Sequence, residues 1–132
     1  MKSIGNKPNA PTTLVFWVIW FAILNGLFIM LFFAAGGVPK GSNEGDGPVG
    51  TIGLAALLAV LSIGFRFLLI PRIKDPVKLL PLMIVGLALA ESIGIIGMFV
   101  VGKEFPETRI ALFVTSASAV IAFAPVYAHS LL

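Results

Sequence analysis

Residues 79–101 read LLPLMIVGLALAESIGIIGMFVV, and this stretch decides the fold class. It is long enough to cross a hydrocarbon core of ~30 Å as one helix. Its one charged side chain, that of Glu91, lies near the middle. A carboxyl group at that depth is costly, so such groups usually pair, are protonated or bind an ion. Glu91 is therefore the first candidate for a functional residue.

The composition of the whole chain also predicts a membrane protein. Of its 132 residues, 58% are hydrophobic and 11% are charged, and the mean hydropathy is +1.06. A soluble domain of this size needs more polar side chains to cover its surface. We therefore predict an integral membrane protein that contacts the lipid bilayer along most of its length.

Three further runs are similarly long and apolar, so we predict an all-α, polytopic membrane protein with short loops. The four transmembrane helices are expected at about residues 13–35, 51–70, 79–101 and 110–129. Consecutive helices that cross a bilayer must alternate in direction, so they are expected to be antiparallel neighbours. Residues 1–132 are then a single four-helix domain, in which residues 1–12 are a short cytoplasmic tail.

The distribution of Lys and Arg predicts the orientation in the membrane. Six of the nine basic residues lie on the side that holds both termini and the second loop: Lys2, Lys7, Arg66, Arg72, Lys74 and Lys78. The other side holds Lys40, Lys103 and Arg109. We therefore predict that both termini are cytoplasmic, in the plasma (inner) membrane of a prokaryote. The first apolar run is too long for a typical signal peptide, so cleavage is not expected.

Several polar side chains are expected at the level of Glu91. Counting 1.5 Å per residue from the cytoplasmic end places Glu91 ~18 Å deep, with Asn25, Ser116 and Ser118 at similar depths. Two interpretations remain open. In one, these side chains and Ser92 form a closed hydrogen-bond network that fixes the register of the bundle. In the other, Glu91 takes up and releases a proton or cation as its surroundings change.

Small residues recur beside Glu91. Gly86, Ala90 and Gly94 are four residues apart and therefore share one face of a helix. Small side chains let helix backbones approach closely in a membrane. We predict that this face packs against another helix, in a homo-oligomer or in a complex with other membrane subunits.

Four other features have structural interpretations. Arg66 is expected to extend to the lipid headgroups, because pairing with Glu91 would require it to span a depth difference of ~10 Å. Pro125 is expected to kink the last helix mildly. The aromatic residues of the first helix are expected to contact lipid and neighbouring helices, so no cofactor is predicted. The Gly-rich first loop, residues 36–48, is expected to be mobile unless a partner orders it.

Several classes of function are not expected. The chain has no Cys and only one His, His129, so no metal site is predicted. It has no phosphate-binding glycine loop and no nucleophile with a general base, so we expect no enzymatic activity. The basic residues are dispersed at the ends of apolar runs, and no nucleic-acid partner is expected.

Residues 84–97, IVGLALAESIGIIG, resemble the ion-binding helix of the c subunit (proteolipid) of rotary ATP synthases. The resemblance covers at most the second and third predicted helices. It implies that Glu91 carries H⁺ or Na⁺ in a ring of subunits and that Ser92 is a candidate sodium ligand. It also implies that the loop between these two helices faces a partner protein.

We therefore expect a small, non-enzymatic membrane subunit of a homo-oligomer or larger complex, with Glu91 as a proton- or ion-carrying carboxylate. The alternative is a structural or accessory membrane protein in which protonated Glu91 donates a hydrogen bond to Asn25 or a hydroxyl. A third hypothesis is a small dimeric transporter, although clear internal repeats and broken helices are lacking in the sequence.

Overall fold

The computed structural model describes residues 12–34, 36–37, 39–45, 48–102 and 104–130. These residues form helices and connecting loops, and none of them forms a strand. The elements are α1 (Thr13–Ile29), η1 (Met30–Ala34), α2 (Val49–Gly64), η2 (Phe65–Leu69), η3 (Ile70–Arg72), α3 (Pro76–Ile95), η4 (Ile96–Val100), α4 (Pro106–Ala122) and η5 (Pro125–Ser130). Four helical segments are long and apolar enough to cross a membrane. The predicted tail, apart from Thr12, lies outside the described residues.

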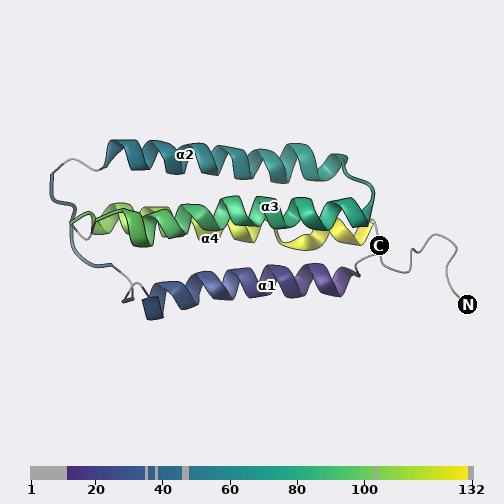
Figure 1. Cartoon of the computed structure of the whole chain (residues 1–132), viewed down its shortest axis with the longest axis horizontal. Helices are drawn as coiled ribbons and strands as arrows, with labels where there is room; N and C mark the ends of the chain where they lie inside the picture. The colour runs from purple at the N-terminus through teal and green to yellow at the C-terminus, as the bar shows by residue number, and fades with distance from the viewer. Residues whose placement is uncertain (1–11, 35, 38, 46–47, 103, 131–132) are drawn as a thin grey trace, which may run out of the picture.

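The helices lie lengthwise beside one another, with α3 and α4 between α1 and α2 (Figure 1). The turn from η3 to α3 lies at one end of the bundle, and the loop from α1 to α2 lies at the other (Figure 1). The larger apolar core joins α1, α3 and α4 and includes Phe16, Leu87 and Phe123. A smaller core joins α2, α3 and α4 around Ala55 and Ile93. The most extensive contact is between α3 and α4, the two helices that position the candidate site.

Two helices begin three or four residues earlier than the predicted ranges. α3 begins at Pro76 rather than residue 79, because Asp75 caps it: its Oδ1 accepts a hydrogen bond of 3.0 Å from the Val77 N–H. Proline suits the first turn of a helix, where its missing N–H has no partner to lose. α4 likewise begins at Pro106 rather than residue 110. The predicted ranges followed apolar residues, whereas both helices begin in polar sequence.

The last helix breaks where only a mild kink was predicted. α4 ends at Ala122, and a short 3₁₀ helix, η5, follows from Pro125. Phe123 N–H donates to Val120 O and Ala124 N–H to Ile121 O, both at 3.0 Å, so the chain tightens into three-residue turns. Pro125 has no N–H to continue the helical pattern and its ring crowds the preceding turn. The helix therefore stops instead of bending.

The described part of the first loop is hydrogen-bonded to the start of α4, a contact that the sequence did not predict. Asn43 Oδ1 accepts hydrogen bonds from the N–H groups of Glu107 (2.9 Å) and Thr108 (3.3 Å). In return, Asn43 N–H donates to Glu107 Oε1 at 3.0 Å. This reciprocal arrangement resembles a capping box, here supplied by a distant segment. Asn43 thereby caps α4 and attaches the loop to it.

Candidate functional site

Glu91 lies at the border between the buried and outward surfaces of α3. Leu87 and Gly94, four residues before and three after it, are buried, whereas Ala88 and Ile95 are exposed. Residues three and four apart are neighbours on a helix surface, so the Glu91 side chain lies between these two pairs. Glu91 itself is half-buried. A side chain in this position can reach the outside of the bundle without crossing the core.

The Glu91 carboxylate has no hydrogen-bond or ion-pair partner within the described part of the chain. Arg66, which the sequence placed too far from Glu91 in depth to pair with it, donates to Ala122 O instead. Among the described residues there is also no group of three His, Asp or Glu side chains that could hold a metal ion. Glu91 is thus an isolated carboxyl group midway along a helix of membrane length.

Two of the four predicted polar partners bond within their own helix. Asn25 Nδ2 donates to Phe21 O at 2.8 Å, and Ser92 Oγ donates to Ala88 O at 2.7 Å. Ser118 is exposed. The closed hydrogen-bond network of the first interpretation is therefore not formed by these residues. Hydroxyl groups in helices commonly satisfy themselves in this way, on the carbonyl four residues earlier.

Ser116 alone among these predicted residues links two helices. Its buried Oγ donates to Ala90 O at 2.6 Å, which ties α4 to α3 one residue from Glu91. The bond uses a main-chain oxygen of α3, not the Glu91 carboxylate. Ser116 therefore positions the backbone beside the candidate site without contacting the acid.

The face formed by Gly86, Ala90 and Gly94 is buried inside the chain itself. A Cβ atom on Gly94 would lie 2.8 Å from both Leu27 Cδ1 and Ser116 Oγ, and one on Gly86 would overlap the ring of Phe123. The face therefore packs closely against helices of its own chain. Because α1 and α4 already cover it, the predicted contact with a second subunit would have to use another face.

Arg66 binds the broken end of α4 and does not extend freely to the surface as predicted. Its Nε donates to Ala122 O at 2.6 Å, and its guanidinium carbon lies 4.7 Å from the centre of the Tyr127 ring. From the other side, Trp20 Nε1 donates to Val120 O at 2.7 Å. The break ends the regular pattern of helical hydrogen bonds, so carbonyls near it need other donors. Phe123 N–H and Trp20 Nε1 both donate to Val120 O, and Arg66 Nε donates to Ala122 O.

Arg109 has a comparable role that sequence reasoning missed. This buried side chain donates from Nε to Gly97 O at 3.2 Å and from Nη2 to Met98 O. Both carbonyls belong to η4, the last turn of the α3 helix. Cations are favoured there by the negative end of the helix dipole. The sequence did hold one signal for this contact. The connection after η4 is short, so it brings the first turn of α4 back to the end of α3.

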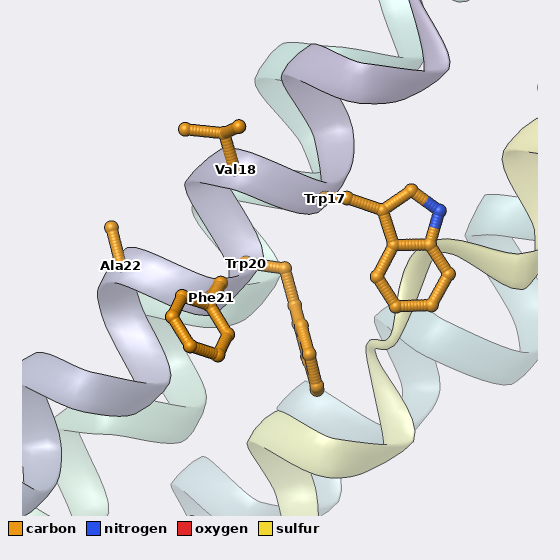
Figure 2. A pocket seen from close by; sticks show the side chains of 5 residues that line it. All are labelled: Trp17, Val18, Trp20, Phe21 and Ala22. Atoms are coloured by element: carbon orange, nitrogen blue, oxygen red, sulfur yellow. The ribbon is translucent and has the colours of Figure 1, made fainter.

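An apolar groove of about 410 Å³ lies on the outward side of α1. Its described lining is Trp17, Val18, Trp20, Phe21 and Ala22. Figure 2 shows the two indoles extending from one side of α1, with Val18 and Ala22 on the other. The indoles pack edge to face, with ring centres 5.5 Å apart. Because the Trp20 N–H is bonded to Val120 O, the groove presents mainly apolar surface.

Fold and site together define a small all-helical protein with four membrane-length helices and one isolated carboxyl group midway along the third. Comparison with protein-family models, with curated proteins and with solved structures finds no match. These comparisons neither support nor contradict the resemblance of residues 84–97 to the rotary ATP synthase c subunit.

Proposed function

We propose that this chain is a small, non-enzymatic membrane subunit in which Glu91 carries a proton or a small cation such as Na⁺. One observation carries the proposal: the Glu91 carboxylate lies midway along a membrane-length helix, at the border of the outward surface, without a partner among the described residues. An ionisable group at such a depth is a functional candidate by default, since its burial is costly. Its place at the border gives an ion a short route to it.

We further infer that the four helices cross a prokaryotic plasma membrane as antiparallel neighbours, with both termini in the cytoplasm. The length and apolarity of the four helical segments support insertion. The excess of Lys and Arg on the side of the turn between η3 and α3 supports the orientation.

Contacts with other copies or with other subunits are proposed to use α1 or α2. Only 17% and 11% of an 18-residue apolar stretch in these helical segments is buried within the chain, compared with 39% and 33% in those of α3 and α4. α1 and α2 therefore have the most uncovered surface for contacts with other chains. Since the Gly86 face is occupied, a ring of subunits would have to differ in its packing from the one that the sequence suggested.

The structural alternative requires Glu91 to be hydrogen-bonded inside the bundle. Asn25 and Ser92 bond to main-chain carbonyls instead, which favours the carrier over this alternative.

The break in α4 is a feature that transporters use at their binding sites, and it gives the third hypothesis, a small dimeric transporter, some support. The carbonyls of Val120 and Ala122 at that break are already bonded to Trp20 and Arg66, so the carrier is again favoured.

Modification by dicyclohexylcarbodiimide tests the proposed role of Glu91, because this apolar reagent attacks a protonated carboxyl group that is reachable from the lipid. We expect it to modify Glu91 in native membranes, more slowly as the pH rises or when sodium is added. The modified residue is identified by mass spectrometry of the peptides. Glu107, which is exposed at the start of α4, is the internal control and should not respond to sodium.

The Glu91→Gln variant completes the test. We expect it to assemble with its partners normally, to resist the reagent, and to abolish ion uptake into vesicles that contain the assembled complex. The Glu107→Gln variant should retain uptake. Failure of native Glu91 to react at any pH, together with failure of Glu91→Gln to assemble, would replace the carrier proposal by the structural one.

The proposed orientation is testable with single cysteines, because the chain has none of its own. Ser42 and Lys74 are both exposed and lie in the loops at opposite ends of the bundle. We expect a membrane-impermeant maleimide added to intact cells to label Ser42→Cys but not Lys74→Cys. The reverse pattern would invert the orientation, and labelling of both positions would contradict insertion.

A further inference from the structure

The connection from η3 to α3 is a fixed turn at one end of the bundle. Ile70 is fully buried, and Ile73 packs against the same core cluster. Pro71 and Pro76 restrict the backbone on either side, and proline fixes its own φ near −65°. The turn is thus held to the bundle by its apolar residues.

The cations of this turn face outward. Arg72, Lys74 and Lys78 are all exposed, whereas Ile70 and Ile73 face the core. Asp75 is the one acidic residue from Arg66 to Lys78, and its Oδ1 accepts the Val77 N–H at the start of α3. The turn therefore displays three positive charges on a backbone that needs little further ordering to bind a ligand.

Acidic residues gather at the opposite end of the bundle. Glu44, Glu104 and Glu107 lie there and are exposed. Of the described basic residues at that end, Arg109 is buried against the carbonyls of η4, and Lys40 is exposed. In the described part of the chain, exposed acids thus outnumber exposed cations at that end, and the end with the η3–α3 turn is the better match to an anionic surface.

We propose that the turn formed by Arg72, Lys74 and Lys78 binds the phosphate headgroups of anionic membrane lipids. The turn joins two helices of membrane length, so in a bilayer its cations lie at the level of the headgroups. Basic clusters directly beside a membrane-spanning helix are attracted to anionic lipids. Arg66, about a turn and a half deeper, is committed to Ala122 O and is not part of this surface. This inference rests on the proposed insertion, not on the role of Glu91.

Native mass spectrometry of the full chain in detergent tests the inference. The protein is given equal amounts of phosphatidylglycerol and phosphatidylcholine with identical acyl chains, and the bound lipids are counted. We expect preferential binding of phosphatidylglycerol. Replacing all three cations by glutamine (R72Q, K74Q and K78Q) should lower the affinity for phosphatidylglycerol about tenfold or more. Binding of phosphatidylcholine should not change.

Two controls separate the turn from general effects of charge. Lys40→Gln removes an exposed cation from the other end of the bundle and should retain the preference. Arg72→Lys keeps the charge of the turn and should also retain it, and unchanged circular dichroism of the triple variant excludes unfolding. Glu91→Gln should bind phosphatidylglycerol like the native chain, so this test is independent of the proposed carrier role.

Three results would overturn the inference. Equal binding of the two lipids would show that the headgroup charge is not recognised. Unchanged phosphatidylglycerol binding by the triple variant would place the site elsewhere. Competition by inorganic phosphate, at concentrations equal to those of the lipid, would assign the turn to a free anion and not to a membrane surface.

Discussion

Replacing Gly86 by leucine is expected to destabilise the bundle by about 3 kcal/mol, because the new side chain has no space between α3 and α4. A Cβ atom at this position already overlaps the ring of Phe123. That ring is 1% exposed and belongs to the segment where α4 breaks, so it cannot swing into solvent or lipid. This overlap can be relieved only if α3 and α4, the two helices with the most extensive contact, move apart.

Gly53→Leu is the matched control. Gly53 also lies inside a membrane-length helix, α2, but no other atom lies within 4 Å of the place that a Cβ atom would occupy. We expect this variant to unfold like the native chain in a titration of dodecylmaltoside micelles with sodium dodecyl sulfate, followed by tryptophan fluorescence. Equal stabilities of the two variants would contradict the close contact between α3 and α4.

The helices were predictable from sequence because the signal is local. A run of apolar residues long enough to cross a bilayer has few alternatives to a helix, since each backbone polar group must be satisfied within the segment. The break in α4 was underestimated for a related reason. Whether Pro125 kinks or ends a helix depends on which donors are available to the carbonyls near the break. Two of these donors, Trp20 and Arg66, lie far away in sequence.

For the candidate site, the sequence identified the acid but not its surroundings. Counting along a helix gives the depth of a residue, whereas its partners depend on the rotation of the helix about its axis. Ser116 and Ser118 lie at similar depths, yet two residues correspond to about 200° of rotation at 3.6 residues per turn. Consequently Ser116 is buried against α3 and Ser118 is exposed.

Counting charges gave a similarly incomplete account of the arginines. In the sequence, Arg66 and Arg109 served to predict the orientation in the membrane. In the structure, both donate to carbonyls at the ends of other helices. Asn43 does the same for the first N–H groups of α4. These caps join segments separated by 11 to 65 residues, so no local pattern predicts them.

The cap made by Arg109 leads to the second large expected effect: Arg109→Leu should destabilise the protein by about 3 kcal/mol. The substitution leaves the carbonyls of Gly97 and Met98 without their side-chain donors at a buried position. An unsatisfied buried acceptor costs about 1–3 kcal/mol. The loss of a cation from the negative end of α3 adds to this cost. Part of this cost is offset, because the variant no longer buries the charged guanidinium group, whose desolvation is itself unfavourable.

Two further variants distinguish the loss of the hydrogen-bonded cap from the loss of a positive charge: Arg109→Lys and Arg72→Leu. Lysine keeps the positive charge but lacks the planar fork that reaches two carbonyls at once, so about half of the loss should return. Arg72 is exposed, and its replacement by leucine should leave the unfolding transition unchanged. Detergent titration followed by tryptophan fluorescence measures all three variants. Full stability of Arg109→Lys would show that charge at the helix end suffices, and full stability of Arg109→Leu would show that the two carbonyls find other donors.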